Sequence, residues 1–376
     1  FPTSLNPTVS VTLDPWIFER GVDQSINQLA TLVSVSWMQP IEFGHRTAIR
    51  TSIASAAYSQ TRWTILQNEL MALVQTYRLH QGGVYRREKY RIAVELADFN
   101  QRLLEALKRQ LQANQIPASD VVLAEVENQT TLQHVETARQ EYVQAQMDLC
   151  QQIGVPRLAD TVELVGNLLS PDYHESTDDD AFVRTALSSR PEILAAQAQV
   201  AGSYDAVSLA RADRIPIPSI GPVYEKDESN VSFYGVGLSS PIPILNTGTP
   251  MLRQRESEYH RDAVSLDQTK QKVIVQVKTA LIRSNEARRL LDKTNAITGP
   301  LQEQAARMDR LYVAGQSDLV KLFQVRQRLI EAENTRLDAV WQLIQAYADL
   351  LTALGATPLV TAVPNPSYEP VTTELR

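Results

Sequence analysis

The feature that most constrains this 376-residue chain is an internal repeat. Three residues of the kind that end helices or mark corners recur at a single offset of 201 positions: Pro40 and Pro241, Asn114 and Gly315, and Gly154 and Gly355. Such residues are poorly tolerated inside regular helices and strands, so a shared offset indicates two copies of one structural unit. We therefore expect two similar halves.

Each copy combines a β-hairpin with a pair of very long helices. Period-two alternation of β-branched and polar residues predicts hairpins at about 5–40 and about 216–241. Helix-forming residues then dominate about 45–153 and about 249–354, and a short turn divides each stretch. In the first long helix we expect a kink or loosened turn at Gly82–Gly83.

The patterns predict four divisions of the chain. These are a first repeat at 1–154, a linker and equatorial region at 155–189, a second repeat at 190–355 and a C-terminal tail at 356–376. The second repeat opens with a helix at 190–213 that has no counterpart before the first hairpin. We therefore expect a first helix, and a targeting segment, upstream of Phe1.

Local signals predict helix ends and helix contacts. Ser119–Asp120 is expected to cap the first return helix, and the acidic run at 178–180 to cap a helix near Ala181. Apolar residues spaced three and four apart predict a coiled-coil contact face on each return helix. The expected faces are Leu337, Val340, Ile344, Tyr347, Leu351 and Leu354 in the second copy, and Leu132, Val135, Tyr142, Leu149 and Ile153, interrupted by Arg139 and Gln146, in the first.

Four amphipathic strands are compatible with more than one kind of assembly. A four-stranded sheet exposes two edges, and closed outer-membrane barrels need at least eight strands, so several chains would have to share one barrel. A soluble β-layer explains the same period-two pattern equally well. Likewise, long helices with a narrow apolar stripe fit a hollow bundle or an ordinary dimeric rod.

Composition and motifs argue against several function classes. The net charge is −7, with 36 basic and 43 acidic residues and no basic stripe, which argues against nucleic-acid binding. The single cysteine, Cys150, excludes an intrachain disulfide, and the five histidines lack the spacing of metal ligands. We find no catalytic motif and expect no enzyme activity, no catalytic residue, no metal site and no cofactor.

Five segments resemble a known family. They are TVSVTLD after Asn6–Pro7, MQPIEFGHR at 38–46, SSRPEILAAQAQV at 188–200, SSPIPILNTG at 239–248 and LYVAGQSDLVKL at 311–322. Their order, twofold repetition and spacing resemble the TolC-like outer-membrane factors of tripartite efflux systems. The QPIEFGHR segment is most similar to the CzcC- and CusC-type outer-membrane subunits of heavy-metal cation efflux pumps.

The resemblance implies a fold, a location and partners. The fold would be mainly α-helical with β-hairpins, in a homotrimer with a 12-stranded outer-membrane β-barrel and a periplasmic helical tunnel. A periplasmic adaptor (membrane fusion) protein would join it to an inner-membrane transporter of RND type, and outer-membrane lipid would surround the strands. Such a protein is a passive aqueous exit duct in the outer membrane of a Gram-negative-type cell, with most of its mass in the periplasm. The alternatives are a non-enzymatic periplasmic coiled-coil adaptor, which would need a lipoyl or barrel domain, and a structural rod.

The resemblance also implies functional positions. The helix–helix turns would be the periplasmic tips that contact the adaptor and form the gate, with Asn114, Pro117, Ser119, Asp120, Gly315, Ser317, Asp318, Lys321 and Gln324. The corners between strands and helices would be Pro40, Gly44, Pro241 and Gly248. Well-known members carry acidic rings where this chain has Lys321 and Gln324. Because Asp120 is the repeat equivalent of Lys321, either these two residues form an ion pair or the acidic constriction is absent.

Overall fold

The structure is a computed structural model that describes most of the chain. The described residues are 5–15, 31–155, 163–168, 179–226, 231–244, 247–314, 316 and 319–357. The chain divides into two compact units. Unit 1 comprises Phe1–Ile65 with Pro191–Gln271, and unit 2 comprises Leu66–Arg190 with Lys272–Arg376.

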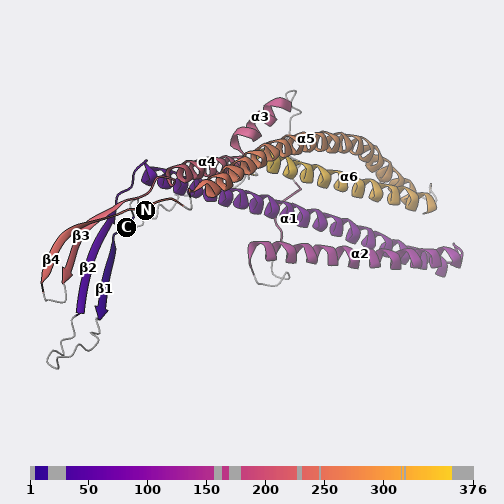
Figure 1. The fold of residues 1–376 in the computed structure, drawn as a ribbon. Helices are drawn as coiled ribbons and strands as arrows, with labels where there is room; N and C mark the ends of the chain where they lie inside the picture. Colours follow the sequence, from indigo (N-terminus) through magenta and orange to yellow (C-terminus); the bar gives the residue numbers. More distant parts are fainter. Residues whose placement is uncertain are drawn as a thin grey trace. The chain divides into compact units, whose positions relative to one another are not determined.

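Unit 1 contains a four-stranded antiparallel sheet in the order β1-β2-β3-β4 (Figure 1). The strands are β1 (Thr8–Pro15), β2 (Thr31–Pro40), β3 (Ser219–Lys226) and β4 (Ser232–Ser239). β1–β2 and β3–β4 are the hairpins of the two repeats. β2 and β3 pair at the centre, with Val35 opposite Tyr224 and Pro40 opposite Ser219, so the two repeats share one sheet.

A buried arginine fixes the end of a helix in unit 1. Helix α4 spans Pro191–Ala212, and Arg46 begins helix α1 (Arg46–Gln112). The guanidinium of Arg46 donates to the carbonyl oxygens of Ala212 and Ile215 and lies 3.3 Å from the carboxylate of Asp213. A cation at a helix C-terminus meets the negative end of the helix dipole. The charge of Arg46, which is 1% exposed, is therefore matched locally.

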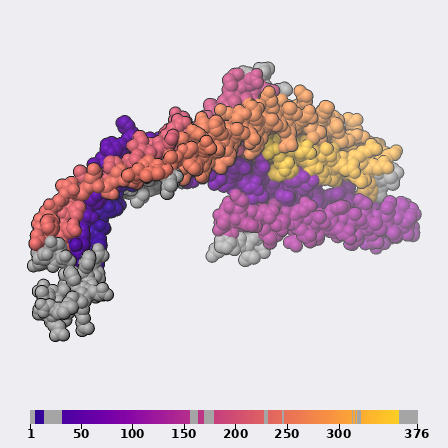
Figure 2. Space-filling model, viewed as in Figure 1, coloured from indigo at the N-terminus to yellow at the C-terminus, as the bar shows by residue number. Residues whose placement is uncertain are grey.

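Unit 2 is a layer of four long helices in the order α2–α1–α6–α5 (Figure 1). The helices are α2 (Ala118–Ile153), α6 (Leu319–Leu354), α1 from Leu66 onward and α5 (Thr249–Val313) from Lys272 onward. The short α3 (Asp179–Ser189) contacts α6. Leu107 of α1 packs with Val121 of α2, Val74 of α1 packs with Ala348 of α6, and Leu291 of α5 packs with Val340 of α6. Figure 2 shows α6 (yellow) between the surfaces of α5 (orange) and α2 (magenta).

Several helix ends are as the sequence predicts. Asn114 has a left-handed backbone with φ 53°, and Gly154 and Gly355 end α2 and α6 with φ 72° and φ 71°. Asp179 and Asp180 lie in the first turn of α3. The prediction for the start of α2 is wrong: Pro117 is its N-cap and no side-chain hydrogen bond caps it. Because proline already holds a φ suited to helix entry, the helix starts earlier and Ser119 and Asp120 fall in its first turn.

The loosened turn expected at Gly82–Gly83 is also a wrong prediction. α1 remains helical through both residues. A Cβ on Gly82 would lie 3.1 Å from Cη2 of Trp341, and a Cβ on Gly83 would overlap the side chain of Leu164. The two glycines therefore allow neighbours to approach the helix closely.

The two predicted contact faces have different outcomes. In α6, Leu337, Val340, Ile344 and Leu351 are buried, which confirms that face. In α2 the predicted face is wrong in part, because Leu132 and Ile153 are exposed while Thr131 and Gln146 are buried. A buried hydrogen bond of 2.8 Å from Nδ2 of Asn100 to Oγ1 of Thr131 accounts for the shift. Polar residues that satisfy one another can replace apolar ones at such a contact.

Some predictions lie outside the described residues. These are the hairpin connections at 16–30 and 227–230, most of the linker (156–162 and 169–178), Gly315, Ser317, Asp318 and the tail beyond 357. Among the described residues, none of the helices combines the length and the apolar character needed to cross a membrane.

Candidate functional site

The register of the sheet gathers apolar side chains on one face. Residues directly opposite each other on neighbouring antiparallel strands share a face, and alternate residues along a strand change face. One face therefore carries Val9, Val11 and Leu13 of β1, Val33, Val35 and Trp37 of β2, Ile220, Pro222 and Tyr224 of β3, and Tyr234, Val236 and Leu238 of β4. We call this the apolar face. Gln39 and Lys226 lie at its two ends.

The opposite face is mostly polar. Ser10 and Ser36 share a hydrogen bond of 2.9 Å there, Thr12 pairs with Ser34, and Ser34 pairs with Glu225. On the apolar face, by contrast, Tyr234 is 83% exposed and Val236 is 76% exposed. A contiguous apolar surface without cover marks a site of contact with lipid or protein. Strands of eight to ten residues are close to the length that crosses a bilayer.

The predicted corner residues lie where the chain passes from strand to helix. Pro40 ends β2 and Pro241 follows β4, while Gly44 and Gly248 take left-handed φ values of 78° and 73° before α1 and α5. In the first corner, Glu42 accepts hydrogen bonds from Arg50 and from Oγ1 of Thr47 at 2.9 Å. The hydrogen bond from Arg50 lowers the pKa of Glu42.

The described tip residues lie at one end of each helical hairpin. Asn114, Pro117, Ser119 and Asp120 form the α1–α2 turn and the start of α2, and Lys321 and Gln324 are exposed in the first turns of α6. No ion pair joins Asp120 to Lys321 within the described chain. Oδ1 of Asp120 instead accepts a hydrogen bond of 3.2 Å from Ser119. A pair between copies stays a prediction.

A groove of about 760 Å³, which the sequence reasoning missed, runs between α2 and α6 over α1. Its apolar lining includes Ile92, Leu96, Phe323 and Ile330. Along its α2 side lie Asp120, Glu127, His134 and Glu141 at seven-residue intervals. Residues seven apart on a helix fall on one side, so this spacing is the signal from which the groove wall could have been predicted.

The lining of the groove carries more acidic than basic side chains. Its two cations are already engaged: Nζ of Lys89 lies 2.8 Å from Asp338, and Arg326 pairs with Asp309 and lies over the ring of Phe99. Burial opposes the charge of Lys89, but hydrogen bonds with Asp338 and Tyr85 outweigh it, and the pKa of Lys89 is raised. At the floor, Oδ1 of the buried Asn100 has no hydrogen-bond partner in the described part of the chain.

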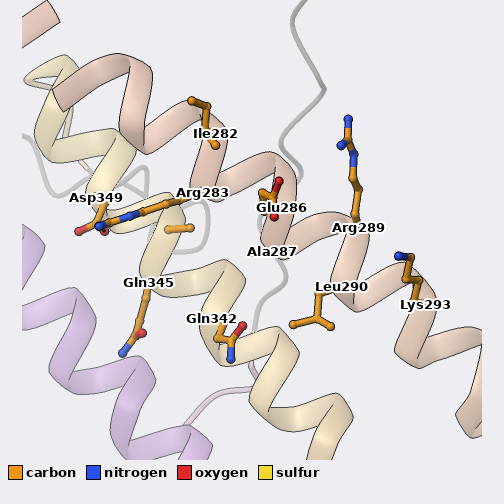
Figure 3. Close-up of a pocket in the computed structure, with 11 residues that line it drawn as sticks. Ile282, Arg283, Glu286, Ala287, Arg289, Leu290, Lys293, Gln342, Gln345 and Asp349 are labelled. Atoms are coloured by element: carbon orange, nitrogen blue, oxygen red, sulfur yellow. Dashed lines mark ion pairs between the residues drawn. The ribbon is translucent and has the colours of Figure 1, made fainter. Parts of the chain in front are cut away.

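A second groove, of about 800 Å³, lies between α5 and α6 (Figure 3). It is lined by Arg283, Arg289 and Lys293 of α5, among others. Asp349 of α6 lies 3.5 Å from Arg283 and 2.5 Å from Arg78 of α1, so one carboxylate joins three helices. In the described ranges, no three His, Cys, Asp or Glu side chains come together as a group that would hold a metal ion.

Comparison with known proteins identifies the family. Residues 182–356 match the model of the family described as outer membrane efflux protein. These residues belong to the outer membrane efflux protein family. A comparison with curated protein sequences gives no match.

Solved structures extend the likeness in fold to the rest of this chain. The outer-membrane channel OprN matches with a TM-score of 0.75 at 15% identity, over 93% of this chain and 82% of OprN. CusC matches with a TM-score of 0.73 at 17% identity, over 93% and 82%. The CmeC outer membrane channel of Campylobacter jejuni matches with a TM-score of 0.75 at 13% identity, over 94% and 78%. The predicted family resemblance and the mainly helical TolC-like fold with β-hairpins are confirmed.

Proposed function

We propose that this outer membrane efflux protein is one subunit of a passive duct that carries substrates out of a cell. The apolar face carries this proposal. Twelve apolar residues in register on four strands leave a large apolar surface without cover, and lipid is a solvent that such a surface favours. The polar face, with its serines and threonines, would then line water. The chain would catalyse no reaction and would only form a path for the substrate.

Three copies would complete the structure in the membrane. β1 and β4 form the two edges of the sheet, and each edge presents unpaired backbone groups. β4 runs antiparallel to β1, so β4 of one copy can pair with β1 of the next as the neighbouring strands already do. In a homotrimer, twelve strands would close one barrel without an edge, and the long helices would continue it as a periplasmic tunnel.

The helical ends would receive the partners. We propose that the tips around Asn114 and Asp120 and the start of α6 at Lys321 and Gln324 meet a periplasmic adaptor protein, together with Gly315, Ser317 and Asp318. The groove between α2 and α6 fits a helix of that adaptor, since its lining includes apolar side chains from α1 and α6 and its α2 wall carries three acidic residues and a histidine at heptad spacing. The adaptor would connect the duct to an inner-membrane transporter of RND type.

Heavy-metal cations are the substrate class that we propose. The resemblance of the QPIEFGHR segment to cation-efflux subunits supports this choice. A cell that lacks its own duct should regain metal resistance when it expresses this chain with a cognate adaptor and transporter. If the chain restored resistance to organic drugs and not to metals, the substrate class would be organic drugs and the proposal of metal cations would be wrong.

One substitution on each face of the sheet tests the membrane role. A lysine at the membrane midplane of a lipid-facing strand costs about 2–4 kcal/mol. Val236→Lys on the apolar face should therefore reduce the amount of chain in the outer-membrane fraction and abolish the resistance it confers. Thr12→Lys on the polar face is the matched control and should insert normally. Equal insertion of both variants would contradict a lipid-facing apolar face.

A further inference from the structure

Contacts at both ends of the groove between α2 and α6 fix its walls on α1. At one end, Phe323 of α6 packs against the buried cluster of α1 and α2 that contains Val121. Toward the other end, Asp338 of α6 lies 2.8 Å from Nζ of Lys89 and accepts a hydrogen bond from Tyr85, both on α1. These contacts within the chain form the groove, and its volume of about 760 Å³ is in the range of small-molecule sites.

An apolar strip runs along the groove. Ile92 and Leu96 lie about one turn apart on α1 and both belong to the lining, so they face the same side of that helix. Phe323 and Ile330 lie about two turns apart on α6 and line the groove in the same way. Ile92 is buried and the other three are half-buried. An apolar ring system placed on this strip would leave water, which is favourable. The strip therefore suits the apolar body of a small molecule.

Acidic side chains border the strip on both walls. Four of them line the groove: Asp120, Glu127 and Glu141 on α2, and Glu331 on α6. All four are exposed, and within the ranges that the structure describes none of them forms an ion pair. The basic residues Lys89 and Arg326 of the lining are already paired with other carboxylates. A cation that enters the groove would therefore meet uncompensated negative charge on both sides.

A buried amide leaves a hydrogen-bond acceptor at the floor of the groove. Asn100 is 4% exposed, and its Nδ2 donates to Oγ1 of Thr131, which also lines the groove. Oδ1 of Asn100 has no partner in the described part of the chain. A buried acceptor without a hydrogen bond costs free energy, so a ligand that brings an N–H group to it gains by satisfying it. This acceptor is independent of the exposed acids and also favours a ligand with N–H donors.

We propose that the groove between α2 and α6 binds an organic cation that has a flat apolar body and an N–H donor. The body lies on the apolar strip, the positive charge lies between Glu127 and Glu331, and the N–H group donates to Oδ1 of Asn100. Such a compound is a bound ligand of the chain and not cargo in transit. The adaptor helix proposed above would compete for the same groove, and this consequence alone rests on the proposed function.

Protection of a thiol placed in the groove tests the site. Gln327→Cys puts a thiol at an exposed position of the lining, and Gln133→Cys puts one at an exposed position of α2 outside it. Cys150 is buried, so the added thiol is the one that reacts. The full chain is purified in detergent, and its alkylation by a maleimide is followed by mass spectrometry. Ethidium, an aromatic cation with amino groups, should slow alkylation of the Gln327→Cys chain about tenfold and leave the Gln133→Cys chain unchanged.

Charge variants of the Gln327→Cys chain test the chemistry of the site. Glu127→Gln with Glu331→Gln should raise the ethidium concentration for half-protection about fivefold, as expected for the loss of exposed ion pairs. Glu136→Gln with Glu303→Gln, at two exposed acids outside the lining, is the matched control and should leave that concentration unchanged. Methylacridinium, an aromatic cation without N–H groups, should need about threefold more than ethidium. Circular dichroism should show equal helix content in every variant.

Four results would overturn the proposal. They are equal protection of the two thiols, an unchanged half-protection concentration after Glu127→Gln with Glu331→Gln, equal half-protection by methylacridinium, and equal protection by the aromatic anion anilinonaphthalene sulfonate. If a lysine-rich helical peptide protected the groove thiol and ethidium did not, the occupant would be a protein helix and the proposed cation site would be wrong. The efflux duct would stand in each case, because the assay contains neither adaptor nor transport.

Discussion

Trp341 of α6 stacks on Tyr85 of α1, with ring centroids 5.5 Å apart and ring planes 14° from parallel. The phenol of Tyr85 also donates to Asp338 of α6, and Nζ of Lys89 lies 5.0 Å from the centre of the Tyr85 ring. α1 belongs to the first repeat and α6 to the second. This aromatic pair is therefore part of what joins the two helical hairpins of unit 2.

Replacing the indole should loosen that junction. An aromatic pair contributes about 0.5–1.5 kcal/mol beyond the area it buries. We predict that Trp341→Leu, which keeps an apolar side chain, lowers the free energy of unfolding by about 1–2 kcal/mol in urea titrations followed by circular dichroism. Tyr58→Leu, at a residue that is 69% exposed, is the control and should change little. Equal effects would mean that the stack contributes nothing specific.

Tyr77 should make the protein sensitive to alkali. Burial, with a smaller effect of Tyr347, raises the pKa of Tyr77 from 10.0 to about 12. A raised pKa means that the folded state holds the proton more tightly than the unfolded chain, so this contribution is present below pH 10 and is lost as pH rises through about 12. We predict that Tyr77→Phe flattens the fall in unfolding free energy over this range. If Tyr77→Phe left the slope of unfolding free energy against pH unchanged, groups other than Tyr77 would cause the fall.

The ion pair of Glu42 and Arg50 should make the free energy of unfolding depend on pH in the acidic range. Because Arg50 lowers the pKa of Glu42, the pair stabilises the folded state above the ordinary carboxyl pKa of 4.5 and is lost as acid protonates Glu42. Glu42→Gln should therefore cost about 1 kcal/mol at neutral pH and nothing at strongly acidic pH. Unfolding measured from pH 7 downwards checks this. A constant difference between the two proteins would contradict a role for the charge.

The turn at Asn114 depends on its left-handed backbone. Asparagine tolerates φ 53°, glycine adopts it without strain, and alanine pays about 1 kcal/mol or more there. We predict that Asn114→Gly is close to neutral in unfolding free energy while Asn114→Ala is destabilising by about 1 kcal/mol. If alanine were as stable as glycine, the backbone geometry would not explain the residue.

Local patterns in the sequence account for much of the fold. Alternation at Val33, Val35 and Trp37 gives β2 and its apolar side, and heptad spacing of Leu337, Ile344 and Leu351 gives the buried face of α6. Both depend on periodicity within one element, which a single sequence displays. The contact face of α2 was predicted only in part, because buried Asn128, Thr131 and Gln146 look like surface residues until their partners are known.

The candidate sites depend more on contacts between distant segments. The groove between α2 and α6 takes its floor from α1, so three separate segments define it, and only its heptad row on α2 is visible in sequence. The apolar face of the sheet needs the β2–β3 pairing to bring both hairpins into one register. The described tip residues were predicted from the family resemblance, and their role in the gate stays a prediction.

The β2–β3 pairing also governs the order of folding. Pro40 and Ser219 lie opposite each other although 179 positions separate them in the chain. Contacts between remote segments form slowly, because the entropy cost of closing a long loop comes before the hydrogen bonds and packing that offset it. The ribosome must therefore synthesise every element from β2 to β3 before these two strands can pair, and α1 and α2 have already been synthesised by then.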